Sequence, residues 1–397
     1  MQLTREEEKA ISGEYGEATA MAYRILVAIG EATDAEKLIP IKWAHVSGVN
    51  YNTIGDSGVE FLNKISREGK VRVRTSINPM GFDRRSPSDL PENFVEKQLE
   101  INEAYEKLGV IPTFSCIPYE LLAIPEKGSQ VSFAESSAAV MANSHLGILT
   151  NKESALSALA SAIAGKTPLS DLRIENNRSP STEVTSELII ENELDYGLLG
   201  YFTGKTIGKS CTGFCNIKKG TDMWRLKSVS AGIGTSGSCG MFKIQEQEMK
   251  NNKSEKTEKM EKVTYGKAEM KRTIDELNTS EDGQIITFGS PQLGMHEMLE
   301  IAVLMEGRKF TKPCKVFCPK DIYNKASECG ISQSLQKSGV EFVCDACTCL
   351  TPLIKKENYD SIITNSVKAS YYMKTANKVS VALKDLKTIT KEYSTSI

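Results

Sequence analysis

The C-terminal part of the chain alternates between short apolar runs and helical stretches, and this alternation constrains the fold more than any other feature of the sequence. In chain order the apolar runs and helical stretches are 284–288, 295–306, 315–318, 320–329, 341–344 and 361–364. Strands that alternate with helices build βαβ units, whose strands form a parallel sheet covered by helices. The sequence therefore predicts an α/β fold.

Residues that can take part in chemistry follow each of these predicted strands. They are Gly289 and Ser290, Cys318, the segment 344–349, and Asn365, Ser366 and Lys368. Ligands of a parallel sheet bind beyond the carboxyl ends of its strands. We therefore expect these residues to meet at one site.

Two further helices and one charged segment organise the rest of the chain. Helical spacing of apolar residues predicts a helix over 92–108 that ends at Gly109, and a small-residue helix over 153–164 ends at Gly165. Residues 249–272 are mostly Lys, Glu, Asn and Met, which indicates a charged insertion or linker. The predicted division is an N-terminal and central α/β region, 1–248, this insertion, and a C-terminal βαβ domain, 273–397.

The charge and composition of the 397-residue chain argue against several classes of protein. A formal net charge of -2 and a pI of about 6.1 provide no basic field for nucleic acid or for an anionic membrane surface. No apolar run reaches the roughly 18 residues of a membrane-spanning helix. Residues 4–7 have the pattern of a helix start rather than of a signal peptide. We expect a cytoplasmic protein without nucleic-acid or membrane partners.

The segment 196–243 is rich in glycine, has no clear periodicity and contains two motif-like stretches. Residues 232–237 fit the dinucleotide fingerprint GxGxxG, but they lack a preceding strand and an acidic residue at the expected distance. Residues 204–210 resemble a phosphate-binding loop with one residue too few between its glycines. Neither stretch is favoured as a nucleotide site, and 204–210 is predicted to be a loop.

The cysteines are the residues best suited to chemistry. Cys116 stands alone, whereas Cys344, Cys347 and Cys349 lie in one short segment. One isolated thiolate and a distant Cys-x-x-Cys are the minimum that holds three irons of a [4Fe–4S] cluster and leaves a fourth iron open to substrate. The alternatives are a buried apolar thiol at Cys116, and a zinc half-site or a redox pair at 344–349. The three histidines are widely spaced and indicate no zinc hydrolase.

Segments spread over nearly the whole chain resemble the large, catalytic subunit of the aconitase X family. They are 44–51, 75–79, 116–119, 135–138, 143–144, 146–147, 150–151, 345–347 and 364–368. The resemblance implies an aconitase-like, multidomain α/β architecture of parallel sheets covered by helices.

The resemblance also implies a chemistry. Members of the family are iron–sulfur hydro-lyases. A large subunit encoded as a separate chain resembles the archaeal form of the enzyme. That form dehydrates (R)-5-phosphomevalonate to trans-anhydromevalonate 5-phosphate in the mevalonate pathway. The alternative substrate is cis-3-hydroxyproline. An iron that no cysteine binds acts there as a Lewis acid on the leaving hydroxyl, and a serine of a small swivelling subunit is the implied base. The expected partners are that subunit and a small anionic substrate.

The resemblance also implies site residues, which lie in the family-like segments or directly beside them. The implied cluster ligands in them are Cys116 and Cys347. The expected substrate-binding residues are His45, Ser47, Gly48, Asn78, Glu135, Ser136, Ser137, Asn143, Asn151, Lys152, Asn365, Ser366 and Lys368. An ammonium beside side-chain donors suits Lys368 to a phosphate or carboxylate. The alternative for these residues is a turn, a helix cap or a solvated lysine.

The chain departs from the family pattern at an expected ligand. The family has Gly-Cys-Pro-His where this chain has Gly289-Ser290-Pro291-Gln292, and Lys152-Glu153-Ser154 replaces Arg-Glu-Gly. A serine oxygen is a poor substitute for a soft thiolate. The family's three-cysteine site is therefore incomplete as written.

Two hypotheses account for this departure. In the first, another thiol completes the cluster site, and Cys344 is the leading candidate because Cys344-x-x-Cys347 recreates the pair of the aconitases proper; Cys318 and Cys239 are alternatives. In the second, the chain is a divergent, cluster-free paralogue that acts as a binding or regulatory subunit, or holds another metal through the cysteines of 344–349. The first hypothesis predicts an enzyme and the second does not.

Overall fold

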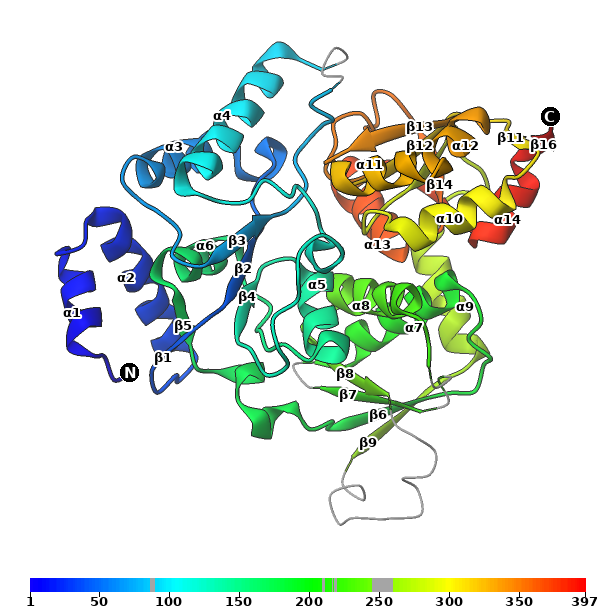
Figure 1. The fold of residues 1–397 in the computed structure, drawn as a ribbon. Coiled ribbons are helices and arrows are strands. Elements are labelled where there is room, and N and C mark those ends of the chain that lie inside the picture. Colours follow the sequence, from blue (N-terminus) through cyan, green and yellow to red (C-terminus); the bar gives the residue numbers. More distant parts are fainter. Residues whose placement is uncertain (86–89, 209–210, 216, 218–219, 245–259) are drawn as a thin grey trace. The chain divides into compact units, whose positions relative to one another are not determined.

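The computed structural model describes residues 1–397 with the exception of 86–89, 209–210, 216, 218–219 and 245–259. The chain forms two compact units (Figure 1). Unit 1 comprises residues 1–81 and the described residues of 87–178, and unit 2 comprises the described residues of 82–86 and 179–397.

A three-stranded parallel sheet forms the centre of unit 1. Strand β2 (Trp43–Val46) lies between β3 (Arg74–Ile77) and β4 (Val131–Phe133). All residues of β2 and β4 are buried, as in strands covered on both faces. The rings of Trp43 and Phe133 meet edge to face with their centroids 4.8 Å apart, so the core of the unit is packed directly on this sheet.

Unit 1 also contains helices. They are α1 (Arg5–Ser12), α2 (Glu17–Ala32), α3 (Tyr51–Ser66), α4 (Glu92–Leu108), α5 (Ser136–Met141) and α6 (Ala155–Ala164), of which α5 and α6 contact the three-stranded sheet. The predicted helix over 92–108 is confirmed, and Gly109 ends it in the left-handed conformation at φ 86°. Helix α6 begins later than expected because Ser154 is its N-cap, and its small side chains pack against α2 and β2. Strands β1 (Leu38–Pro40) and β5 (Lys166–Pro168) form a separate antiparallel pair.

A five-stranded parallel sheet forms the C-terminal half of unit 2. Its order is β13-β12-β10-β14-β15, which are Val340–Cys344, Cys314–Cys318, Ile285–Phe288, Ser361–Thr364 and Ser380–Leu383. Helices α10 (Met295–Leu304), α11 (Lys320–Glu328), α12 (Ile331–Lys337) and α13 (Val367–Tyr372) lie between consecutive strands, and α14 (Leu386–Glu392) follows β15. The βαβ arrangement predicted from the apolar runs is confirmed.

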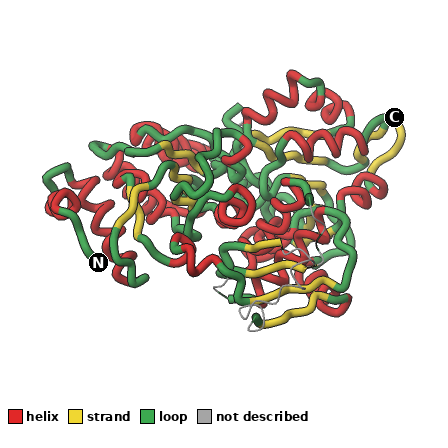
Figure 2. Tube along the Cα trace, turned by 60° about the horizontal axis from the view of Figure 1, so that its bottom comes forward, coloured by secondary structure: helices red, strands yellow, loops and turns green. Residues whose placement is uncertain are grey.

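Unit 2 also contains a four-stranded parallel sheet of order β8-β7-β6-β9. The strands are Phe242–Ile244, Thr212–Cys215, Thr182–Ser186 and Glu261–Tyr265, and Figure 2 shows them side by side. The same part of unit 2 contains helices α7 (Glu193–Thr206), α8 (Met223–Ser236) and α9 (Lys267–Leu277). The sequence did not indicate α7, because consecutive residues from 196 to 201 are all buried and the helix has no single apolar face.

Both glycine-rich stretches contribute to the contact between α7 and α8. A Cβ atom at Gly232 would lie 2.4 Å from the carbonyl oxygen of Gly197, and one at Gly204 would lie 2.3 Å from the hydroxyl of Ser236. The glycines therefore let the two helix backbones approach closely. The prediction of a loop at 204–210 is wrong for 204–206, which belong to α7.

The expected insertion at 249–272 falls partly on 249–259, which lie outside the described residues. Residues 261–265 form β9 and pair with β6, and α9 begins at Lys267. The division of the chain at residues 248 and 273 stays a prediction. Across the part of the chain that the structure describes, every helix is too short or too polar to cross a membrane.

Candidate active site

The central strand of the five-stranded sheet ends at a group of polar side chains. Ser290 follows β10, and its Oγ atom lies 2.9 Å from Sγ of Cys349 and 3.7 Å from Sγ of Cys347. Ser366, which follows the neighbouring strand β14, donates its hydroxyl to the carbonyl oxygen of Ser290. Residues that follow β10, β13 and β14 thus meet beyond the carboxyl end of the sheet, where ligands of parallel sheets bind.

The thiols of Cys347 and Cys349 form a pair. They are hydrogen-bonded to each other, and this contact followed by burial raises the pKa of Cys349 well above its usual value, while the Lys368 ammonium acts in the opposite direction. The Sγ atom of Cys347 also lies 3.8 Å from the carbonyl oxygen of Gly289. Ala369 packs against both cysteines. The two sulfur atoms are therefore held together in a buried setting.

Cys344 belongs to a second group of contacts. It lies opposite Cys318 in the β12–β13 register, and the two thiols are hydrogen-bonded. Arg85 places Nη2 2.9 Å from Sγ of Cys344, and its guanidinium forms an ion pair of 2.6 Å with Asp83. Asp83 in turn accepts the backbone N–H of Cys344 at 2.8 Å. The residue expected to replace the missing ligand is thus engaged by an arginine, a carboxylate and a neighbouring thiol.

A small pocket of about 40 Å³ opens beside Ser290. It is lined by the predicted residues Asn365, Ser366 and Lys368 together with Glu193, Lys227 and Glu297. Lys227 is only 2% exposed, forms an ion pair with Glu297 and donates to the carbonyl oxygen of Gln292 at 3.1 Å. Asn365 donates to the buried carboxylate of Glu193 at 3.2 Å. The structure therefore brings the three predicted polar residues into one charged pocket.

The sequence did not indicate Glu193, Lys227 or Glu297 as site residues. One signal was available for Lys227, because helical spacing places it on the same face as Trp224 and Ala231, and both of these also line the pocket. A lysine on an otherwise apolar helix face is unusual unless it is paired. The two carboxylates carried no comparable signal.

Gln292, which stands where the family has histidine, connects two parts of this site. Its Nε2 atom donates to the carbonyl oxygen of Ala346 at 2.9 Å. The backbone N–H groups of Leu350 and Thr351 close a turn on the carbonyl oxygen of Cys347 at 3.0 and 3.1 Å. The loop that carries the cysteine pair is therefore both tied to the β10 loop and folded on itself.

In unit 1, the side chain of His45 lies between those of Ser76 and Asn78. Its Nδ1 and Nε2 atoms lie 2.8 Å from Oγ of Ser76 and 2.8 Å from Oδ1 of Asn78. Complete burial lowers the pKa of His45 to about 4, so the imidazole is neutral at pH 7. The predicted Ser47 and Gly48 lie close by, and their carbonyl oxygens accept the hydroxyl of Tyr105 at 3.4 and 3.2 Å.

Cys116 is buried in unit 1, in the segment that runs beside the end of β3. The backbone N–H of Ser115 donates to the carbonyl oxygen of Ile77 at 2.9 Å, and the backbone of Ser115 also contacts His45. Asn78, which follows β3, is the other partner of His45. Cys116, His45 and Asn78 therefore share one end of the unit 1 sheet.

The predicted residues 135–143 take structural roles. Glu135 is the N-cap of α5 and accepts the backbone N–H and the hydroxyl of Ser137 at 3.3 and 2.8 Å, and Ser136 begins the helix. Asn143 exchanges hydrogen bonds with the backbone of Thr150 at 2.8 and 3.1 Å, and its Oδ1 accepts Nη1 of Arg178 at 2.9 Å. These contacts agree with the alternative of a helix cap and a turn, and the substrate-binding function of these residues stays a prediction.

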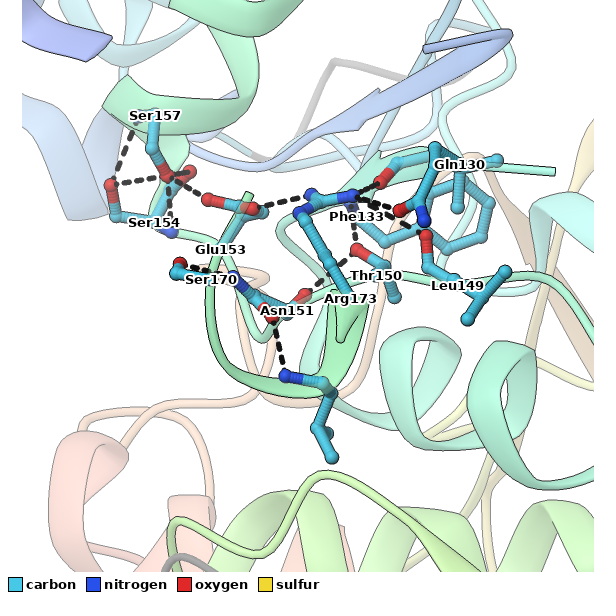
Figure 3. Close-up of polar contacts among 12 residues, drawn as sticks. Gln130, Phe133, Leu149, Thr150, Asn151, Glu153, Ser154, Ser157, Ser170 and Arg173 are labelled. Carbon is cyan, nitrogen blue, oxygen red and sulfur yellow. Dashed lines mark hydrogen bonds and ion pairs between the residues drawn. The ribbon is translucent and has the colours of Figure 1, made fainter. Parts of the chain in front are cut away.

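Asn151 and Lys152 line a separate hollow of about 250 Å³ together with Glu153 and Ser170. Figure 3 shows that the buried Arg173 side chain approaches Glu153, with which it forms an ion pair of 2.8 Å. Arg173 also donates to the carbonyl oxygen of Val131 at 2.7 Å. Asn151 accepts the backbone N–H of Leu172 at 3.1 Å and donates to Ser170 at 3.2 Å. The ion pair therefore fixes the segment that carries both predicted residues.

The cysteine pair can be tested for its fit to the expected cluster. Among the residues that the structure describes, no group of three or more His, Cys, Asp or Glu side chains is arranged to hold a metal ion. Within unit 2, however, the thiols of Cys347 and Cys349 adjoin each other beside the Ser290 hydroxyl. Soft thiolates are the donors that iron–sulfur clusters require. The donor chemistry therefore fits part of a cluster ligand set.

Comparisons with known proteins agree with this architecture. Models of the first, second and third domains of aconitase X match residues 1–176, 179–275 and 283–395. The crystal structure of Thermococcus kodakaraensis aconitase X in its holo form superposes with a TM-score of 0.90 at 34% sequence identity, over 99% of this chain and 100% of that chain. The predicted aconitase-like α/β architecture is confirmed.

The similar proteins carry two kinds of name. Phosphomevalonate dehydratase large subunits of Methanocaldococcus jannaschii and Thermococcus kodakarensis are 36% and 35% identical, over 98% and 99% of this chain and 100% of each relative. The cis-3-hydroxy-L-proline dehydratase of Hypocrea jecorina is 31% identical over 94% of this chain but only 65% of its own length. The chain thus matches the whole of the first two relatives and part of the third.

Proposed function

This chain belongs to the aconitase X family, and from that premise we propose that it is the large, catalytic subunit of a hydro-lyase that dehydrates (R)-5-phosphomevalonate to trans-anhydromevalonate 5-phosphate. The proposal is supported by full-length likeness to relatives named phosphomevalonate dehydratase large subunits. The match to part of a longer cis-3-hydroxy-L-proline dehydratase makes that activity the second candidate. The cytoplasmic location expected from the sequence stays a prediction.

The observation that carries the proposal is the pair of thiols beside Ser290 at the carboxyl end of the sheet. Cys347 would hold an iron–sulfur cluster there, and Cys116 and Cys344 are the other ligands predicted from the sequence. When bound, a cluster with one iron free of cysteine supplies Lewis-acid chemistry at the leaving hydroxyl.

The pocket next to these thiols would bind the anionic substrate. Lys368 lies at its wall with Asn365 and Ser366, so an ammonium and two neutral side chains are available to a carboxylate or phosphate. Lys227 forms an ion pair with Glu297, and we assign Lys368, whose ammonium also acts on the Cys349 thiol, to the substrate. The small volume of the pocket, about 40 Å³, would also leave little room for water beside the reacting atoms.

A small subunit would complete the enzyme. The relatives named above are large subunits, and a large subunit implies a small one. Both ring nitrogens of His45 are engaged by Ser76 and Asn78, and burial lowers its pKa to about 4, so this imidazole is a weak base. We therefore assign the proton-abstracting base to the partner rather than to this histidine.

The test is an assay of the complex. The chain would be purified without oxygen together with the small subunit encoded in the same genome, and dehydration would be followed with 5-phosphomevalonate and with cis-3-hydroxy-L-proline. We expect turnover of the phosphorylated substrate only when both subunits and the cluster are present. Faster turnover of hydroxyproline would replace the substrate assignment, and an iron-free complex without either activity would favour the binding or regulatory subunit.

A further inference from the structure

We propose that Cys347 and Cys349, and not Cys347 and Cys344, are the two thiolates that unit 2 supplies to the cluster. Cys349 would take over the function of the thiol that Ser290 cannot provide. This inference rests on the proposed function in one respect, which is that the protein binds an iron–sulfur cluster. It names Cys349 as the ligand, whereas the Cys-x-x-Cys spacing in the sequence favoured Cys344.

The side chains at positions 290 and 349 are in contact. The hydroxyl oxygen of Ser290 lies 2.9 Å from the sulfur of Cys349, and both side chains are buried. A metal–sulfur bond is about 2.3 Å long, so two atoms this close lie within reach of the same iron. Oγ of Ser290 and Sγ of Cys349 therefore lie within reach of the same metal position, and the sulfur is the donor that iron in a cluster prefers.

The sulfur atoms of Cys347 and Cys349 also contact each other. Cys347 and Cys349 are hydrogen-bonded through their thiols, and Cys347 lies 3.7 Å from the same Ser290 hydroxyl. The backbone N–H groups of Leu350 and Thr351 close a turn on the carbonyl oxygen of Cys347, so both cysteines lie in one tightly folded loop. Each thiol would release its proton when it binds iron, so ligation replaces the thiol–thiol hydrogen bond by two metal–sulfur bonds.

Cys344, the competing cysteine, contacts other groups. The sulfur of Cys344 is 2.9 Å from the Arg85 guanidinium and hydrogen-bonded to Cys318. Arg85 is itself held by an ion pair with Asp83, which also accepts the backbone N–H of Cys344. To bind iron, the Cys344 thiol would have to leave the Arg85 guanidinium and the Cys318 thiol. The contacts of the Cys349 thiol with Cys347 and Ser290 lie at the proposed ligand position itself.

The experiment compares single cysteine variants of the complete chain. Wild type, Cys349→Ala, Cys347→Ala and Cys344→Ala would be reconstituted without oxygen with iron and sulfide, and iron, acid-labile sulfide and visible charge-transfer absorption would be measured per chain. Cys329→Ala is the matched control because Cys329 is exposed. We expect about four irons in wild type, Cys344→Ala and Cys329→Ala, and a loss of at least half in Cys347→Ala and Cys349→Ala.

A double variant separates ligation from folding. Ser290→Cys combined with Cys349→Ala moves the thiol across the 2.9 Å contact, and we expect it to regain the iron that Cys349→Ala loses. Iron loss in Cys344→Ala with full retention in Cys349→Ala would overturn the inference and leave the proposed function intact. A wild-type protein that takes up no iron and sulfide would overturn both.

Cadmium alone provides a readout that does not depend on cluster assembly. Thiolate-to-metal absorption would be titrated in the metal-free chain and its variants. We expect the absorption per bound Cd²⁺ to fall by a similar fraction in Cys347→Ala and Cys349→Ala, and to stay at the wild-type value in Cys344→Ala. A decrease confined to Cys344→Ala and Cys347→Ala would assign the pair to the Cys-x-x-Cys and contradict the inference.

Discussion

Ser290 and Cys349 are separated by 59 residues in the chain, yet Oγ of one lies 2.9 Å from Sγ of the other. The contact joins the loop after β10 to the loop after β13, and Gln292 reinforces the junction through the carbonyl oxygen of Ala346. A hydroxyl therefore stands directly beside a thiol at the place where we expect a cluster to be bound.

Lys368 is expected to bind the anionic substrate. Replacement by methionine removes a charged hydrogen bond, which is worth on the order of 1.5–3 kcal/mol, so KM should rise about 10- to 100-fold while Lys368→Arg keeps most of the affinity. Steady-state kinetics of the complex measures this change. Lys391→Met, at an exposed position on α14, is the control and should stay near wild type. An unchanged KM in Lys368→Met would remove this lysine from the substrate site.

The buried ion pair between Arg173 and Glu153 is expected to be important for stability. Removal of one partner leaves an uncompensated buried charge, so Glu153→Gln and Arg173→Met should each cost about 3–5 kcal/mol in the free energy of unfolding. Denaturant unfolding measures the loss. Glu126→Gln breaks the exposed pair with Lys42 and should cost at most about 1 kcal/mol. Equal losses in the buried and exposed variants would contradict the prediction.

The stability of the protein should depend on pH through His45. Burial lowers its pKa from 6.5 in the unfolded chain to about 4, so below pH 6.5 the unfolded chain takes up a proton that the folded protein does not. The stabilisation is complete above pH 6.5 and is lost progressively between pH 6.5 and pH 4, by about 3 kcal/mol in all.

The measurement for His45 is the free energy of unfolding as a function of pH. His45→Gln cannot titrate, so the difference between variant and wild type should shrink as the pH falls from 6.5 to 4. A difference that is constant over this range would show that His45 keeps an ordinary pKa in the folded protein.

The crossing of α7 and α8 should not tolerate a side chain at Gly232. Its Cβ would approach the carbonyl oxygen of Gly197 to 2.4 Å, and relief of such overpacking costs about 1–3 kcal/mol. Gly232→Ala should therefore lower the unfolding temperature. Gly208→Ala is the matched control, because nothing lies within 4 Å of a Cβ there. A Gly232→Ala protein as stable as this control would mean that the helices can move apart freely.

The sequence indicated the elements whose pattern is local. The apolar runs of β10, β12, β13 and β14 and the spacing of α4 each lie within a few consecutive residues, and the structure has them where they were expected. Helix α7 was missed because it is buried on several sides and its apolar residues follow no single stripe. Local periodicity reports which face of an element is buried, so it is silent where every face is.

By itself the sequence determined that this is an aconitase-like α/β protein with a Cys-rich loop at the carboxyl end of a parallel sheet. Its cysteine spacing suggested Cys344 as the partner of Cys347, because both belong to one short motif. Only the tertiary structure decided which thiols meet: Cys344 remains with Cys318 and Arg85, while the turn after β13 brings Cys349 to Cys347 and Ser290. The physical reason is that a side chain's direction in a non-repeating loop depends on long-range contacts that no local pattern encodes.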